Sequence, residues 1–369
     1  SAPPLQAPSS PSTLLAGFDP VCASAWTHPS RHRGRVSIAL PPRSPLPRSR
    51  CVTWSPSLTL VPTRQCFNAC GSCSFRRPLE ATAPLVDAPT PEQVRTLLQS
   101  RPRALEVLLL SGEWPAGSSH RPAWFQLLLR CSRLALEAGR LPHTNAGPLS
   151  RREMAALARL NPSMGLMLEG LGPAYDALHQ QAPSKTLAVR LQQLEQAGRL
   201  GVPFTTGLLL GVGETRLERL DALELLAQLQ RQWGHLQEVI LQPWRPDGAV
   251  PQPLAAGEQE ELLELIAAAR AILPPEVHLQ LPPNLWPLAS LPRALEAGID
   301  DLGGIDCVDV INPAYPQPAL AGLTAVLAAA GWELRPRLCV HGAWIPALPL
   351  PLRRRVAPLA EALAEGRGC

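Results

Sequence analysis

The chain has 369 residues, of which 46% are hydrophobic and 17% are charged, so it can bury one large core and wholesale disorder is excluded. The formal net charge is +4, but residues 1–52 hold six arginines and one acid, a balance of +5, which leaves about −1 for residues 53–369. A nearly neutral body lacks the positive surface that a polyanion requires, so nucleic-acid binding is excluded as the main function.

The nine cysteines are too few for a disulfide scaffold at this length, and three of them lie within eight residues. This distribution indicates a reducing compartment and a metal site. The sequence contains no uninterrupted apolar run of about 18 residues, so we predict no membrane span and no membrane partner. The expected location is therefore the cytoplasm.

Residues 1–52 form the first predicted region. They are rich in Pro, Ser, Ala and Arg, and they cannot bury enough apolar surface to offset the entropy lost on ordering. We predict a disordered extension and favour a loose bacterial extension, but a transit peptide has the same composition. The chain starts at Ser1, which leaves the true N-terminus open.

Residues 53–345 alternate between short apolar runs and longer amphipathic stretches, a pattern typical of parallel strands joined by helices. Six to eight such units predict an α/β fold, a TIM-type barrel that is complete or partial, with its chemistry on the loops after the strands. A C-terminal helical tail is expected over residues 346–369. The predicted strands are 57–62, 104–111, 164–168, 203–210, 237–242 and 277–281. The predicted helices are 91–100, 122–139, 150–160, 186–199, 215–233 and 257–272.

The strongest motif follows the first predicted strand and contains Cys66, Cys70 and Cys73. A fully ligated 4Fe–4S cluster takes four cysteine thiolates, so three on one loop leave one iron open. The amino and carboxylate groups of S-adenosylmethionine (SAM) can bind that iron, and one electron then cleaves the sulfonium and releases a 5′-deoxyadenosyl radical. The alternatives are a zinc site completed by a distant His or Cys, or simple buried thiols.

Two glycine-containing motifs follow later strands. In Gly112-Glu113 the carboxylate can accept a hydrogen bond from the methionyl ammonium of SAM, and the alternative is a surface turn. In the stretch that ends at Gly211-Val-Gly-Glu214, the glycines allow a flat adenine to approach the backbone. The alternative there is a glycine-rich turn that starts a helix. We predict that all four named residues bind the cofactor.

Four further polar residues follow predicted strands or begin the next helix. His143, close to Asn145, is a candidate base or hydrogen-bond donor for substrate, although a lone His is more often structural. Glu169 is a candidate for the ribose hydroxyls of SAM, against the alternative of a buried structural acid. Arg190 is a candidate bidentate hydrogen-bond donor to the SAM carboxylate, and the alternative is a surface Arg.

Lys185 is the only lysine in the chain, beside 33 arginines. Lysine is a compact point charge that can lose its proton, whereas arginine is planar and stays charged. We therefore hypothesise that Lys185 has a role in the site, and the alternative is chance retention.

Several longer stretches resemble one known family over residues 53–345. These stretches are PTRQCFNACGSCSF, LPHTNAG, NPSMGLMLEG, PFTTGLLLGVGET, GHLQEVILQPW, LQLPPNLWP and AGIDDLGGI. The segments SMGLMLE, PFTTG and GHLQEVI are more specific than the cysteine motif, which a very large superfamily shares. On these segments the chain resembles subunit 1 of FO synthase, the CofG family of radical SAM barrels. It departs from that family at Ser72, which is usually aromatic, at Pro243-Trp244, and in a shorter segment after residues 303–305.

The resemblance implies a lyase that forms the deazaflavin FO (7,8-didemethyl-8-hydroxy-5-deazariboflavin). Its substrate would be 5-amino-5-(4-hydroxybenzyl)-6-(D-ribitylimino)-5,6-dihydrouracil, an adduct that a partner subunit makes, and ammonia would be lost. A one-electron donor such as ferredoxin or flavodoxin is implied as well. By position, the expected polar contacts to the uracil or ribityl groups are Thr205, Thr206, Gln242 and Asn284.

Two rival functions remain at this point. One is another radical SAM enzyme of similar layout, such as the partner subunit or a menaquinone-pathway cyclase. The other is a non-catalytic module in which a cluster or zinc is structural. The PFTTG and GHLQEVI segments favour the ring-closing subunit over the first rival, and the acids Glu113, Glu169 and Glu214 argue against the second.

Overall fold

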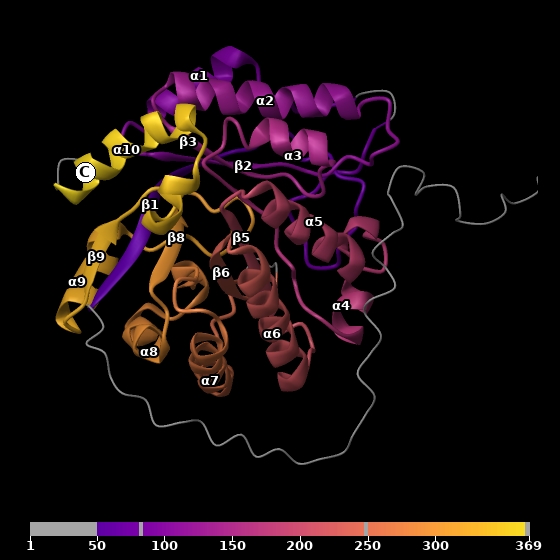
Figure 1. Cartoon of the computed structure of the whole chain (residues 1–369). Helices are drawn as coiled ribbons and strands as arrows, with labels where there is room; N and C mark the ends of the chain where they lie inside the picture. Colours follow the sequence, from indigo (N-terminus) through magenta and orange to yellow (C-terminus); the bar gives the residue numbers. More distant parts are fainter. Residues whose placement is uncertain (1–49, 81–83, 247–249, 366–369) are drawn as a thin grey trace, which may run out of the picture. The chain divides into compact units, whose positions relative to one another are not determined.

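Nine parallel strands form the single sheet of the described part of the chain, which comprises residues 50–80, 84–246 and 250–365 in the computed structural model (Figure 1). The predicted extension lies outside these residues except for its last three. The strands are β1 (Cys51–Leu60), β2 (Glu106–Leu110), β3 (Leu141–Asn145), β4 (Ser163–Gly165), β5 (Phe204–Leu210), β6 (Leu236–Pro243), β7 (His278–Gln280), β8 (Asp301–Ile305) and β9 (Glu333–Pro336).

The sheet closes into a complete barrel because β1 pairs with both β2 and β8. The strand β1 is long enough for two neighbours on one side: residues 51–54 pair with β9, and residues 57–60 pair with β2. Eight strands therefore form the barrel, and β9 extends it at the amino end of β1. This confirms the predicted TIM-type barrel and settles that it is complete.

Helices cover the outside of the barrel, as Figure 1 shows. They are α1 (Pro91–Ser100), α2 (Arg121–Glu137), α3 (Arg151–Leu157), α4 (Pro173–Leu178), α5 (Leu187–Leu200), α6 (Arg216–Trp233), α7 (Ala256–Ile272), α8 (Leu291–Ala297), α9 (Leu320–Ala329) and α10 (Leu350–Ala364). Short 3-10 turns are η1 (Pro183–Lys185), η2 (Pro283–Leu285), η3 (Leu288–Ser290) and η4 (Gly342–Ala347). Within the described ranges, no helix has the length and apolar character that a membrane span requires.

The helix starts follow the local capping chemistry. The side chains of Thr90, Ser150 and Thr215 each accept a hydrogen bond from the third residue of the helix that follows, which is Gln93 in the case of α1. In the reciprocal bond, the backbone N–H of Ser150 donates to the carboxylate of Glu153. These reciprocal bonds explain why the predicted starts of α1 and α3 agree with the structure.

The strands β3, β8 and β9 were absent from the predicted set, and β1 begins six residues before its predicted start. The strand β9 has only four residues, none of them buried. For the others the reason is that the barrel interior is polar or small at these positions. His143 and Asn145 face inward from β3, and β8 contributes Gly303 and Gly304. Such strands lack the apolar alternation from which a strand is normally inferred.

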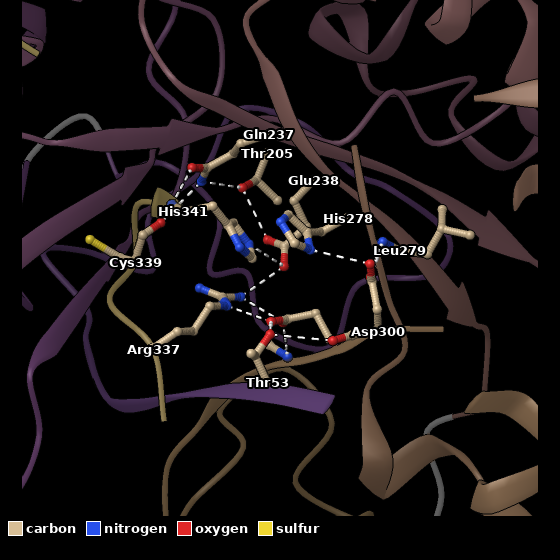
Figure 2. A network of polar contacts seen from close by, with 12 residues as sticks. Thr53, Thr205, Gln237, Glu238, His278, Leu279, Asp300, Arg337, Cys339 and His341 are labelled. Carbon is tan, nitrogen blue, oxygen red and sulfur yellow. Dashed lines mark hydrogen bonds and ion pairs between the residues drawn. The ribbon is translucent and has the colours of Figure 1, made fainter. Parts of the chain in front are cut away.

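A buried ionic network, which we call the floor network, fills the lumen near the amino ends of the strands (Figure 2). Arg337, which follows β9, donates two bonds to Asp301, at 2.5 and 2.6 Å, and one to Glu238, at 2.7 Å. Thr205 donates to Glu238 at 3.2 Å, and the ring of His341 stacks on that of His278 with 3.8 Å between centroids. A TIM-type barrel normally fills this space with branched apolar side chains.

The charges of the floor network balance around one guanidinium. The pKa of Asp301 lies well below its usual range because Arg337 outweighs the effect of burial. Burial raises the pKa of Glu238 and that of Glu106, which lies nearby. Burial also lowers the pKa of His341. The network is therefore organised around the ion pair between Arg337 and Asp301, with the other buried groups packed around it.

The side chains of Glu238, Asp301 and His341 bring three potential metal ligands within 4.8 Å of one another. The guanidinium of Arg337 already bonds to both carboxyl groups, so this side chain occupies the place that a metal ion would take. A divalent ion would meet that fixed positive charge at close range. We therefore interpret the cluster as a structural ion pair.

Replacing Arg337 with Met should destabilise the barrel by about 3–5 kcal/mol, because a buried carboxylate would lose its counter-charge. The double variant R337M/D301N should recover part of that loss, since it removes the orphaned charge as well. The free energy of unfolding in urea measures both changes. The control is Arg335→Met, whose side chain is 58% exposed, so this variant should unfold at the same urea concentration as wild type. Equal stability of R337M and R335M would contradict the assignment.

Candidate active site

The cysteine loop lies at the carboxyl end of β1, where a barrel of this type places its chemistry. Backbone bonds hold the loop in place: Cys66 N donates to Arg77 O at 2.9 Å, and Phe67 N donates to Glu113 O at 3.0 Å. All three thiols are free; those of Cys66 and Cys70 are half-buried, whereas Cys73 is exposed. The main chain is therefore anchored while the sulfurs remain available as ligands.

The three thiols lie on one short loop, where they can act together as metal ligands. In the described part of the chain, the only three candidate ligands within 4.8 Å of one another are those of the floor network. Ligation of a cluster by Cys66, Cys70 and Cys73 stays a prediction. Burial raises the pKa of Cys70 to about 11, so ligand formation must displace a proton.

Glu113 is held next to the cysteine loop by three side chains. Its carboxylate accepts bonds from Asn68 at 2.8 Å, from Arg190 at 3.2 Å and from Ser184. The preceding Gly112 brings the two loops together, because a Cβ there would lie 2.2 Å from the backbone oxygen of Gln65. Gly112 therefore serves close packing between the loop after β2 and the cysteine loop.

Glu169 faces the same group of side chains from the end of β4, and its carboxylate accepts a bond from Lys185. Its backbone is in the left-handed region, at φ = 75°, which is uncommon for a residue other than glycine. Two backbone bonds maintain this conformation: Glu169 N donates to Gly207 O at 3.1 Å, and Leu209 N donates to Glu169 O at 2.8 Å. The strand β5 thus positions the carboxylate at the mouth of the barrel.

The carboxylates of Glu113 and Glu169 and the ammonium of Lys185 stay ionised. Burial alone would raise the pKa of Glu113, but Arg190 and Lys185 hold it below its usual value, and Lys185 does the same for Glu169. Burial and Arg190 act to lower the pKa of Lys185, yet the neighbouring carboxylates raise it overall. The mouth of the barrel therefore offers fixed positive and negative charges, which match the ammonium and carboxylate of a methionyl group.

The predicted adenine loop has a different local role. Glu214 accepts bonds from Gly211 N at 2.7 Å, from Val212 N at 2.8 Å and from Arg219 Nε at 2.8 Å. Its side chain is fully buried. Glu214 therefore shapes the loop after β5, and direct contact of Gly211 or Glu214 with a cofactor stays a prediction.

The upper lumen of the barrel is open. On β2 the outward Val107 and Leu109 are fully buried against helices, whereas the inward Leu108 and Leu110 are partly exposed. The same alternation occurs on β6 and β7. Inward residues can be exposed only if the lumen between them is accessible. We call this space the chamber; its half-buried inward residues include Thr59, Leu108, Leu110, Asn145, Met167, Ile240, Gln242 and Gln280.

Some of the predicted substrate residues lie in or below the chamber. Gln242 and Asn145 face it near the carboxyl ends of their strands. His143 lies deeper, its Nδ1 is 2.7 Å from Ser163 Oγ, and burial lowers its pKa to about 3. It is therefore neutral and can only exchange hydrogen bonds at ordinary pH. Thr205 belongs to the floor network through its bond to Glu238.

Two other predicted residues serve the framework. Thr206 points away from the lumen, is fully buried and accepts a bond from Leu168 N at 3.1 Å. Asn284 donates to Asp309 Oδ2 and to Tyr315 O, both at 2.8 Å, and so holds the loop after β8. The structure does not bring Thr206 into the chamber.

Sequence reasoning missed several residues around the site. Asn68 and Ser184 both bond to Glu113, and they are adjacent in sequence to residues that were singled out. Their positions in the cysteine loop and beside Lys185 were the available signal. Arg337 and Gln280 carried no local signal, because their partners are distant in sequence.

Comparison with known proteins identifies the superfamily. A profile of the radical SAM superfamily matches residues 60–226. The chain is 46% identical over 309 residues to the 7,8-didemethyl-8-hydroxy-5-deazariboflavin synthase of Thermosynechococcus vestitus, an alignment that covers 83% of this chain and 98% of the relative. It is 48% identical over 320 residues to the synthase of the same name from Synechococcus elongatus, covering 85% of this chain and 94% of the relative.

Solved structures share the fold at low sequence identity. The FeFe-hydrogenase maturase HydG from Carboxydothermus hydrogenoformans superposes with a TM-score of 0.63 at 18% identity, covering 84% of this chain and 71% of that one. Methylornithine synthase (PylB) superposes with a TM-score of 0.57 at 14% identity, covering 78% and 84%. At these identities the likeness concerns the fold alone.

Replacing Cys66, Cys70 or Cys73 singly with Ser should abolish iron binding, because each is predicted to supply one of three local ligands to the iron–sulfur cluster that the superfamily implies. Reconstituted wild-type protein should hold about four iron atoms per chain. Iron content and visible absorbance measure the outcome. The control is Cys307→Ser, an exposed thiol on the loop after β8, which should retain the cluster. Loss of iron in C307S, or zinc alone in the wild type, would contradict the assignment.

Replacing Lys185 with Met should weaken SAM binding by about tenfold or more, because the ammonium that here pairs with Glu169 is the expected partner of the SAM carboxylate. The variant K185R should bind more weakly than wild type, since a planar guanidinium does not fill the place of a compact ammonium. Equilibrium binding of SAM to reconstituted protein is the measurement. The control is Arg199→Met, which removes an exposed cation from α5. If K185R and K185M both bind SAM as tightly as wild type, Lys185 has no role in SAM binding.

Proposed function

Since the chain belongs to the family of radical SAM enzymes named 7,8-didemethyl-8-hydroxy-5-deazariboflavin synthase, we propose that it catalyses the ring closure that forms the deazaflavin FO. The observation that carries this proposal is identity of 46–48% over nearly the whole length of these relatives. The ionised mouth and the open chamber below it are the matching structural features.

We assign the substrate as 5-amino-5-(4-hydroxybenzyl)-6-(D-ribitylimino)-5,6-dihydrouracil, which loses ammonia, so the enzyme is a lyase. When bound, the 4Fe–4S cluster and SAM supply a 5′-deoxyadenosyl radical that abstracts hydrogen. The protein contributes binding, orientation and exclusion of competing reactions. Methionine and 5′-deoxyadenosine are the expected by-products.

The residues at the mouth hold the cofactor in this proposal. Glu113 accepts from the methionyl ammonium, and Arg190 with Lys185 faces the carboxylate. Glu169 takes the ribose hydroxyls, an exchange that releases Lys185 from its present pair. Glu113, Glu169 and Arg190 are buried and Lys185 is partly buried, which strengthens these contacts relative to bulk solvent.

The chamber holds the adduct below the cofactor. Its aliphatic residues Leu108, Leu110 and Ile240 pack against the ring faces, while Asn145 and Gln242 exchange hydrogen bonds with polar groups. A mixed surface of this kind suits a substrate that combines an aromatic ring with a polar heterocycle.

We assign two further partners by chemistry. A one-electron donor of the ferredoxin or flavodoxin type would reduce the cluster, and Cys73 is the exposed one of the three cysteines that would hold it. The second partner is the subunit that supplies the adduct. Both partners are assigned from the chemistry of the reaction, and no docking surface is assigned to either.

The decisive experiment mixes the reduced, cluster-loaded protein with SAM and the adduct under anaerobic conditions. We expect deazaflavin fluorescence together with 5′-deoxyadenosine, because the radical must be formed and then consumed by the adduct. Cleavage of SAM without deazaflavin would instead indicate another radical SAM enzyme of similar layout. Absence of both, with the cluster intact, would indicate a non-catalytic module.

A further inference from the structure

His143 is a buried histidine of β3 to which the proposed reaction assigns no role. Its register partners are Leu108 on β2 and Ser163 on β4. The next residue, Thr144, is fully buried on the outer face of the strand, so the ring of His143 faces the lumen. Leu108 is the first half-buried residue of β2 above the floor network. The imidazole therefore lies in the lowest layer of the chamber wall.

The tautomer of this imidazole is fixed by the hydroxyl group of Ser163. Ser163 Oγ donates to the backbone oxygen of Cys339 at 2.8 Å, and two oxygens at that distance need a proton between them. The hydroxyl has only one proton, so it must accept from His143 Nδ1, which lies 2.7 Å away. Because burial lowers the pKa of His143 to about 3, the neutral ring carries no second proton. The free lone pair is therefore on Nε2.

This Nε2 atom is presented to the lumen without a partner. Within the described ranges it makes no hydrogen bond, yet it keeps contact with solvent, whereas both unpartnered ring nitrogens of His179 are sealed from solvent. Gly165 leaves the nitrogen uncovered, because a Cβ at that position would lie 2.9 Å from Nε2. The bottom of the chamber thus contains one accessible hydrogen-bond acceptor of fixed orientation.

The chamber residues beside Nε2 on the strands that flank β3 are apolar. Leu108 lies on β2, Gly165 lies at the end of β4, and Met167 follows it. The carboxamides of the chamber lie higher: Asn145 is two residues further along β3, and Gln242 is near the carboxyl end of β6. This part of the chamber therefore combines a single acceptor with apolar walls.

We propose that Nε2 of His143 accepts a hydrogen bond from the phenol hydroxyl of the substrate, with Ser163 as the positioning residue. The proposal rests on the proposed function and names the part of the substrate that reaches the bottom of the chamber. A phenol has one hydroxyl on an otherwise apolar ring, so one acceptor between apolar walls satisfies it. A pyrimidine imide would leave its carbonyl groups unpaired there, and a ribityl chain would leave its other hydroxyls unpaired. The heterocycle then lies higher, beside Asn145 and Gln242.

The test compares the adduct with its analogue that lacks the phenol hydroxyl. Binding of each to the full-length, cluster-loaded, SAM-bound but unreduced protein is measured by calorimetry, so that no turnover is needed. We expect removal of the hydroxyl to weaken binding about tenfold in wild type and less than twofold in His143→Phe, which lacks the acceptor. A purely structural role of His143 would weaken binding of both ligands equally. The ratio in H143F would then stay tenfold, which would overturn the proposal.

Two further variants and a control sharpen this comparison. His143→Gln, whose carboxamide oxygen can reach the place of Nε2, should keep more of the discrimination than H143F. Ser163→Ala should reduce the discrimination, because the ring can then carry its proton on Nε2. The control is His120→Phe at the N-terminus of α2, a half-buried histidine outside the barrel, which should keep the full tenfold ratio.

The tautomer is tested without substrate, by NMR of wild-type protein labelled at the histidine nitrogens. We expect the proton of His143 on Nδ1, in the signal that is missing from H143Q. A proton on Nε2 would overturn the proposal, and so would equal binding of both ligands by wild type. Deazaflavin formation is measured separately. Product without discrimination refutes the His143 contact alone, whereas discrimination without product refutes the ring-closing function alone.

Discussion

The buried guanidinium of Arg337 is the interaction on which the polar interior of this barrel depends. Most barrels of this type are filled by branched aliphatic side chains, which need no partner. Here Asp301 and Glu238 replace them, and one cation from the segment after β9 satisfies both. Burying an unpaired carboxylate would cost several kcal/mol, so the polar floor can exist only with this segment in place.

A polar floor has consequences for the space above it. The floor network occupies the amino ends of the strands, while the inward residues of the upper half remain partly exposed. The result is a chamber bounded below by hydrogen-bonding groups and above by the ionised residues of the mouth. As in other barrels of this type, the amino ends of the strands serve stability and the carboxyl ends carry the candidate active site. In this protein, however, the stable end is lined by buried charged and polar side chains instead of aliphatic ones.

The mouth is assembled from four different parts of the chain. The cysteine loop follows β1, Glu113 follows β2, Glu169 follows β4, and Lys185 and Arg190 come from η1 and α5. Parallel strands end at the same edge, which explains why residues so distant in sequence meet there. The left-handed backbone conformation of Glu169 is energetically unfavourable, and its two hydrogen bonds to β5 stabilise it. Such strained residues are typical of functional sites.

The sequence by itself determined the repeating strand–helix pattern, the cysteine triad and the motif residues Glu113, Glu169, Arg190 and Lys185, because each depends on local spacing or residue type. Only the tertiary structure decided that the barrel is closed, that Thr206 faces outward, that Glu214 bonds within its own loop, and that Arg337 and Gln280 meet Glu238 inside the lumen. The physical reason is that β3 and β8 bury polar or small residues whose partners lie on other elements: His143 contacts Ser163, 20 positions away, and Asp301 bonds to Arg337, 36 positions away. A pattern read along the chain cannot contain such pairings, since they exist only once the strands have closed into a ring.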